Sequence, residues 1–144
     1  MKKELQEKLF KKYPDIFRQK ETPGQLNIEC GDGWYELIDL LCEEIQNRVN
    51  NLNIARQRRI KNGPRTIVPT KSEVFVCEAA QVKQKFGGLR FYTLDDDDFI
   101  KGLIAMATTM SYKICELCGN SGSFESDKHI KVRCVECQKA KSSQ

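Results

Sequence analysis

Four cysteines near the C-terminal end of the sequence have the clearest chemical meaning. They form two pairs, each with two residues between its members: Cys115 and Cys118, then Cys134 and Cys137. Two cysteines at this spacing can direct both thiolates to one centre, and two such pairs supply the tetrahedral all-sulfur shell that suits Zn²⁺. The length of chain between the pairs is typical of a zinc ribbon. The pattern predicts a zinc site, with two disulfides or a redox-active pair as the alternatives.

A zinc ion held by four thiolates has a structural role, because a catalytic zinc keeps one position for water. His129, the one histidine, could replace a cysteine as ligand, but four well-spaced thiols already fill the shell. A single histidine also falls short of the ligand set of a zinc-associated nuclease. Thiol redox chemistry is disfavoured, because Cys115 follows a predicted helix C-terminus, where the helix dipole raises a thiol pKa. The chain has no phosphate loop or HExxH motif, so we expect that it is not an enzyme.

The composition is that of one domain, or of one domain with a small metal-bound appendage. The chain has 144 residues, of which 40% are hydrophobic and 31% charged, and its net charge of +4 is modest for a nucleic-acid-binding protein. Residues 1–12 do not resemble a secretory signal, and no apolar run is long enough to span a bilayer. Three further cysteines, Cys30, Cys42 and Cys77, make the total odd, which favours a reducing cytoplasm. Cys42 and Cys77 lie among apolar neighbours and are predicted to be core residues.

Three helices are predicted from apolar residues at helical spacing. The first covers 2–12, the second begins at a cap formed by Asp32, and the third covers 99–114. Asparagines weaken the second helix, which either stops near residue 50 or continues with breaks to Lys61. The four aspartates at 95–98 could suggest a metal site, but their position at a helix start favours capping. One stripe of the third helix is expected to be apolar: Phe99, Leu103, Met106, Met110 and Ile114.

An alternating pattern after Pro69 predicts two strands, 74–86 and 89–92. Gly87 and Gly88 join them, because both can adopt the positive φ angles of a tight hairpin turn. Ala79 and Ala80 leave room for a bulge or a short helical turn before the hairpin. The predicted fold class is α+β, with helices packed on a small antiparallel sheet and a C-terminal four-cysteine zinc ribbon. We expect a core at 1–114, a zinc ribbon at 115–138 that is rigidly joined to the preceding helix, and a tail at 139–144.

Two groups of basic residues could contact a partner or nucleic acid. The first is a run at the end of the second helix, which a solvated helix end explains equally well: Arg56, Arg58, Arg59 and Lys61. The second lies on the hairpin, where basic residues alternate with the aromatic residues Phe86, Phe91 and Tyr92: Lys83, Lys85 and Arg90. Such a face could stack on single-stranded bases. The simpler interpretation, in which the aromatics are core and the lysines only solvate the outer face, is favoured here.

Three blocks together resemble a family of small uncharacterised proteins from bacteriophages, prophages and bacteria. These blocks are 30–42 with its GDGW motif, 81–92 with the motif QVKQKFGGLRFY, and 111–120 with the later Cys134 and Cys137 pair. The resemblance implies a compact α+β protein with a C-terminal zinc site, and it implies no activity. Members of the family often carry a tryptophan before the second cysteine pair, whereas residues 129–133 contain none.

The leading functional hypothesis is a phage-encoded, non-catalytic zinc-binding interaction protein that binds and modulates a host protein. Small size, a closed metal site, the lack of a catalytic set and the phage-like resemblance favour it. The alternative is a nucleic-acid-binding zinc-ribbon module that uses the two basic groups. Both hypotheses place the protein in the cytoplasm of a bacterial or phage-infected cell and away from membranes.

Overall fold

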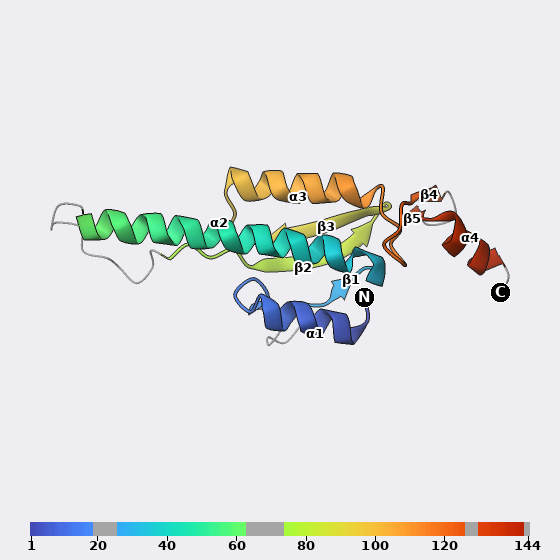
Figure 1. Ribbon diagram of the computed structural model, residues 1–144, viewed down its shortest axis with the longest axis horizontal. Coiled ribbons are helices and arrows are strands. Elements are labelled where there is room, and N and C mark those ends of the chain that lie inside the picture. Colours follow the sequence, from blue (N-terminus) through green and yellow to red (C-terminus); the bar gives the residue numbers. More distant parts are fainter. Residues whose placement is uncertain (19–25, 63–73, 126–129, 143–144) are drawn as a thin grey trace.

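The computed structural model describes residues 1–18, 26–62, 74–125 and 130–142. It shows an α+β protein, as predicted, with a long central helix beside a small sheet (Figure 1). The elements of the main body are α1 (Lys3–Lys12), β1 (Ile28–Glu29), a 3₁₀ turn (Asp32–Trp34), α2 (Tyr35–Asn62), β2 (Ala79–Lys85), β3 (Gly88–Thr93) and α3 (Asp98–Ser111). The cysteine region adds β4 (Ser123–Glu125), β5 (Lys131–Arg133) and α4 (Val135–Ser142). It lies at one end of the long axis of the molecule.

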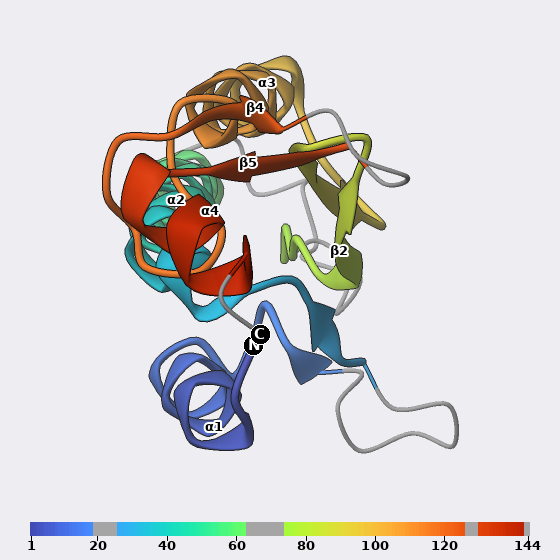
Figure 2. The same cartoon turned by 90° about the vertical axis from the view of Figure 1, so that its right-hand side faces the viewer.

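The main sheet has the strand order β1-β2-β3. β2 and β3 are antiparallel, but β1 pairs parallel to β2, with Ile28 opposite Val82 and Glu29 opposite Lys83. The predicted antiparallel hairpin is confirmed, and β1 is an additional parallel strand that the sequence did not predict, because it is only two residues long and gives no alternating signal. Figure 2 shows that α2 lies on one side of this sheet.

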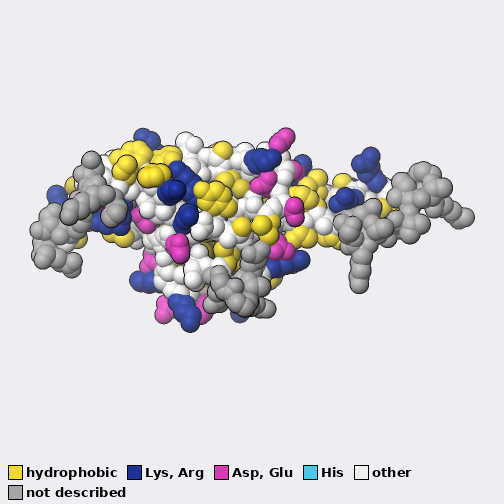
Figure 3. All heavy atoms as spheres, turned by 180° about the vertical axis from the view of Figure 1, so that it is seen from behind, with side chains coloured by type: hydrophobic (Ala, Val, Ile, Leu, Met, Phe, Trp, Pro, Cys, Tyr) yellow, Lys and Arg dark blue, Asp and Glu magenta, His cyan; other side chains and the backbone are white. Residues whose placement is uncertain are grey.

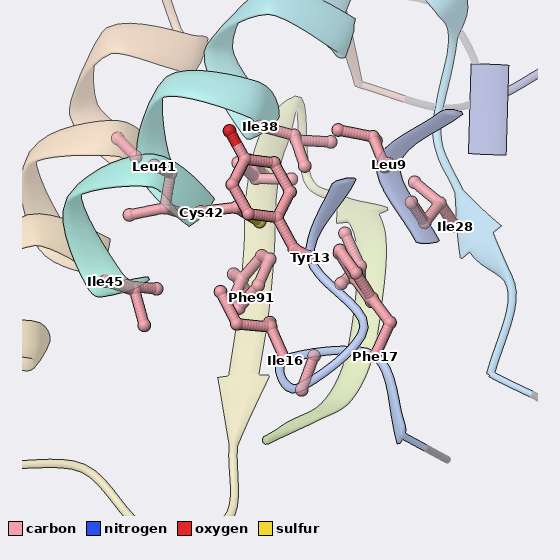
Figure 4. Close-up of a cluster of buried hydrophobic side chains, with 14 of the residues drawn as sticks. Leu9, Tyr13, Ile16, Phe17, Ile28, Ile38, Leu41, Cys42, Ile45 and Phe91 are labelled. Atoms are coloured by element: carbon pink, nitrogen blue, oxygen red, sulfur yellow. The ribbon is translucent and has the colours of Figure 1, made fainter. Parts of the chain in front are cut away.

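The hydrophobic core lies between α2, α1 and the inner face of the sheet. α2 contributes Ile38, Cys42 and Ile45, which are completely buried (Figure 4). Phe17 packs edge-on against Phe91 of β3, with ring centroids 6.5 Å apart. The core has its apolar side chains at helical spacing on α2 and at alternate positions on β3, as amphipathic elements require.

α2 runs without a break to Asn62, so the asparagines that weaken the predicted helix do not end it. Asn53 has a tertiary role, because its side chain donates to the carbonyl of Phe75 and accepts from the amide of Phe75. Asp32 does not cap this helix. Its carboxylate instead accepts a hydrogen bond from the amide of Lys2, at 2.7 Å. No helix in the described parts of the chain is long and apolar enough to cross a membrane.

The hairpin turn lies one residue earlier than the sequence predicts. Lys85 pairs with Gly88, so Phe86 and Gly87 are the two central residues, with φ angles of 53° and 77°. Gly88 is needed for space, since a Cβ there would lie 2.5 Å from the ring of Tyr112. β2 starts at Ala79 and not at residue 74. The irregularity predicted at Ala79 is confirmed, because the register shifts between Ala79 and Gln81.

Asp97 caps α3: its carboxylate accepts a hydrogen bond from the amide of Ile100, so the capping interpretation of the aspartates is confirmed at this residue. The predicted apolar stripe is only partly the buried one. The fully buried residues of α3 are Ile100, Ala107 and Ser111, whereas Phe99, Met106 and Met110 are 52%, 58% and 44% exposed. The sequence pattern could not distinguish these two faces because both are apolar. Packing in the core therefore does not explain the apolar side chains on the exposed face of α3.

Candidate metal centre

The four predicted cysteines come together at one point. The sulfur atoms of Cys115, Cys118, Cys134 and Cys137 all lie within 4.8 Å of one another. Sulfur atoms bound tetrahedrally to zinc lie about 3.8 Å apart, given Zn–S bonds of about 2.3 Å. The cluster can therefore hold a metal ion, and its all-sulfur chemistry matches zinc. All seven cysteines are free thiols in the structure, which does not support the disulfide alternative.

Two tight turns position the sulfur atoms. In the first, the amide of Cys115 donates to the carbonyl of Asn120 and the amide of Gly119 donates to the carbonyl of Cys115. Gly119 has a φ of 82°, which a residue with a side chain rarely adopts, as expected where the backbone curls round a metal. In the second turn, β5 leads into α4, and the amide of Cys137 points at the sulfur of Cys134 at 3.4 Å. α4 extends to residue 142, into the segment predicted as a tail.

The backbone around Cys115 favours its thiolate form. Burial raises the pKa of Cys115, but the amides of Cys134, Cys118 and Leu117 outweigh burial and lower this pKa to about 7. The prediction of a raised pKa at Cys115 was therefore wrong, because these close N–H groups favour the thiolate. Thiol–thiol hydrogen bonds to Cys134 and Cys118 raise the pKa of Cys137 to about 12. A metal must displace that proton, so metal affinity should rise with pH.

The first cysteine turn rests directly on the segment that precedes α2. The amide of Gly31 donates to the carboxylate of Glu116 at 3.0 Å, and the amide of Gly33 donates to the carbonyl of Glu116 at 2.8 Å. A Cβ on Gly31 would lie 2.1 Å from that carbonyl oxygen, and one on Gly33 would lie 2.2 Å from the carbonyl oxygen of Cys115. Only glycine fits at both positions. The GDGW motif therefore serves contact with the metal centre, a role that the sequence interpretation as a helix cap missed.

Two further contacts fasten the cysteine region to the main body. The indole N–H of the buried Trp34 donates to the carbonyl of Ile114, directly before the first ligand. At the hairpin turn, the side-chain amide of Gln84 donates to the carbonyl of Ile130, and Gly87 lies against the ring of Phe124. Parts of all three sequence blocks therefore contact the cysteine region, although they are far apart in the chain.

The remaining cysteines show no features of a reactive site. Burial raises the pKa of Cys42 well above its ordinary value, and burial raises the pKa of Cys30 and of Cys77 to about 12. Cys42 and Cys77 are 0% and 2% exposed, which confirms their prediction as core residues. Within the cluster, Cys115 has the low pKa but is buried, whereas Cys118 is exposed but has a raised pKa. His129, the alternative ligand, lies outside the described residues.

The structure separates the two predicted basic groups. The first group is exposed on the last turns of α2, at the opposite end of the long axis from the hairpin turn (Figure 1): Arg56, Arg58, Arg59 and Lys61. The second group lies on β2 and β3, where Lys83 is directly opposite Arg90 and Lys85 is close to the turn. A single compact ligand at the hairpin would therefore contact only the second group.

Comparison of the chain with protein-family models, curated proteins and solved structures finds no match. The resemblance to phage and bacterial proteins therefore stays a prediction. The function has to be inferred from the geometry of this chain alone.

Proposed function

We propose that this chain is a phage-type, non-catalytic interaction protein in which structural zinc stabilises the fold and an apolar groove binds a helix of a host protein. The non-catalytic part rests on the four thiols, which would leave a bound zinc no position for water or substrate. The binding part rests on one observation, the exposed apolar groove between α2 and α3.

The groove has a volume of about 170 Å³ and eight lining residues: Leu37, Leu40, Leu41, Glu44, Leu103, Met106, Ala107 and Met110. Leu40 and Met106 are more than half exposed, which is costly in water unless a partner covers them. A groove between two helices suits an amphipathic helix, and methionine side chains adapt to its shape. Glu44 is the one charged residue of the lining, so a basic residue on the partner helix would complement it.

A pull-down from bacterial lysate tests this function. Tagged wild-type protein should retain one stoichiometric host protein at physiological salt, with or without nuclease. Met106→Glu should lose it, because a carboxylate would have to be buried in the apolar contact. Ile54→Glu is the matched control, since Ile54 is also an exposed apolar residue of a helix but does not line the groove. Direct titration of the purified host protein should then show the same difference. Equal retention by wild type and Met106→Glu would rule out the groove as the binding site.

Nucleic-acid binding is a second candidate function. The observation that favours it is the outer face of the main sheet, which is turned away from α2 and carries Lys83, Lys85 and Arg90. Binding through phosphates would fall steeply with salt. It would also be lost on nuclease treatment of the lysate, which distinguishes it from a protein partner.

A further inference from the structure

The outer face of the β2–β3 hairpin carries basic residues and lies on the side of the sheet away from α2 (Figure 2), with α3 beside Arg90 and Tyr92. The strand register places Lys83 opposite Arg90 and Gln81 opposite Tyr92 on this face, whereas Val82 and Phe91 point into the core. Figure 3 views the molecule from this side and shows Lys and Arg side chains beside exposed apolar groups. Glu29 of β1 is the acidic neighbour, opposite Lys83. The strand positions of this face therefore carry three positive charges and one negative charge, while Glu125, ion-paired with Arg133, lines the adjoining hollow and Asp96 lies with Lys101 in the groove beside Arg90.

An aromatic platform continues this face at the hairpin turn. It is a hollow of about 430 Å³ lined by Phe86, Tyr112, Phe124, Glu125 and Ile130. Phe86 and Phe124 are 65% and 56% exposed, and the rings of Tyr112 and Phe124 are 5.4 Å apart. The Lys85 ammonium lies 5.2 Å from the centre of the Phe86 ring, and the Arg90 guanidinium lies 3.4 Å from the Tyr112 hydroxyl. Positive groups and ring faces are thus interleaved.

Phe86 occupies a position that folding alone would not give to phenylalanine. Its φ of 53° is in the left-handed region, which a bulky side chain adopts only at a cost in free energy. Asparagine followed by glycine is the preferred pair for a two-residue turn with two positive φ angles. The ring also gains little from burial, because most of it is exposed. Strained positions of this kind are concentrated at functional sites.

We propose that the platform and the basic hairpin face bind single-stranded nucleic acid, with bases stacked on Phe86 and Phe124 and phosphates contacting Lys85 and Arg90. This inference deepens the second candidate function and is independent of the groove. A single strand fits because its bases expose their ring faces, whereas a duplex hides them. A protein partner fits less well, because charged residues are depleted at the centre of protein–protein interfaces.

Fluorescence anisotropy with labelled oligonucleotides of about 12 nucleotides tests the site, since the known single-strand modules cover about 4–16 nucleotides. The zinc-loaded full chain should bind oligo(dT) or oligo(U) more tightly than a duplex of equal length. Comparison of oligo(dU) with oligo(U), which differ only in the 2′-hydroxyl, then identifies the preferred sugar. Raising the salt about fourfold should weaken binding about 20-fold, if three phosphates are contacted.

Phe86→Asn is the decisive variant. It should weaken single-strand binding about 5- to 150-fold, the loss of one stacked base. The same variant should unfold at an equal or higher temperature, because Asn-Gly suits the turn. Loss of binding therefore cannot be attributed to misfolding. Arg58→Gln, which removes one charge at the far end of α2, should leave affinity within about twofold.

Three results would overturn the site. Binding by Phe86→Asn as tight as by wild type would remove the platform from the interaction. A larger loss of single-strand affinity with Arg58→Gln than with Phe86→Asn would show that nucleic acid binds at the end of α2 and not at the hairpin. Failure to bind any oligonucleotide at about 100 µM, the weak end of non-specific affinities, would exclude nucleic acid as the ligand. If the pull-down with Phe86→Asn then lost a protein that wild type captures, the face would be assigned to that protein.

Discussion

At the scale of single residues, the contact between Gly33 and the first cysteine turn is among the tightest in the protein. A Cβ on Gly33 would lie 2.2 Å from the carbonyl oxygen of Cys115 and 2.4 Å from the amide nitrogen of Gly119. These are backbone atoms of the metal-binding turn, so they cannot move aside without distorting the sulfur positions. Gly33, in the turn before α2, therefore controls the position of cysteines that are distant in the chain.

Gly33→Ala should destabilise the protein by about 1–3 kcal/mol, the usual cost of overpacking, and should weaken zinc binding. Gly102→Ala is the matched control, because a Cβ on Gly102 meets nothing within 4 Å. It should stabilise α3 by about 1 kcal/mol. Urea unfolding and a competitive zinc chelator measure the two effects. Equal stability and zinc affinity of Gly33→Ala and wild type would show that the contact is looser than the structure indicates.

At the scale of the elements, Asp97 joins α3 to α2. Its carboxylate caps α3 and also forms an ion pair with Arg48 of α2 at 2.8 Å. Partial burial raises the pKa of Asp97, but the amide of Ile100 and the guanidinium of Arg48 together lower it by more than burial raises it. The pKa therefore lies below its ordinary value. This carboxylate therefore stabilises the folded state when it is ionised.

Ionisation of Asp97 also sets the direction of a pH dependence. An aspartate with a lowered folded pKa contributes stability above its unfolded pKa of about 3.9, and this contribution is lost as the pH falls through the folded value. The difference in free energy of unfolding between wild type and Asp97→Asn should therefore be constant above about pH 5 and shrink below about pH 4. At neutral pH, the free energy of unfolding of Asp97→Ala should be about 1 kcal/mol lower than that of Asp97→Asn, because an asparagine side chain can still cap the helix.

Asp98→Asn provides the control for this experiment. The Asp98 side chain is fully exposed, and its ion pair with Lys101 is on the surface, so the substitution should change stability little at any pH. Protonation of the cysteines affects all these proteins equally and cancels in the differences. A difference between wild type and Asp97→Asn that stays the same from pH 7 to pH 3 would contradict the assigned role of the carboxylate.

The sequence predicted those elements whose signal is local. Cysteine spacing indicated the ligands, the period of α2 indicated its buried face, and Asp97 fell within a predicted cap. The turn at Phe86 and the parallel strand β1 were not predictable, because neighbours distant in the chain determine them: Tyr112 requires Gly88 to be small, and β2 supplies the partner of β1. For the same reason, the sequence indicated only a helix cap in the segment that contains Gly31 and Gly33, and the contact with Glu116 became evident only in the structure.

At the scale of the whole molecule, the metal centre connects the two proposed binding surfaces. One cysteine turn lies against the start of α2, which also forms the groove, and β4 lies against the hairpin turn and forms part of the aromatic platform. Zinc should therefore stabilise the platform by fixing Phe124, while the groove depends mainly on α2 and α3. Removal of zinc is expected to affect nucleic-acid binding more than protein binding.

The structural role of zinc is tested most directly by the zinc content of the purified full-length chain, measured with its thermal unfolding before and after chelation. We expect one zinc per chain, a large fall in unfolding temperature on chelation, and loss of both zinc and the folded C-terminal third in Cys118→Ser. Cys42→Ser, at a buried cysteine outside the cluster, should keep its zinc. A chain that binds no metal, or whose unfolding temperature is unchanged by chelation and by Cys118→Ser, would contradict the structural role of the four cysteines.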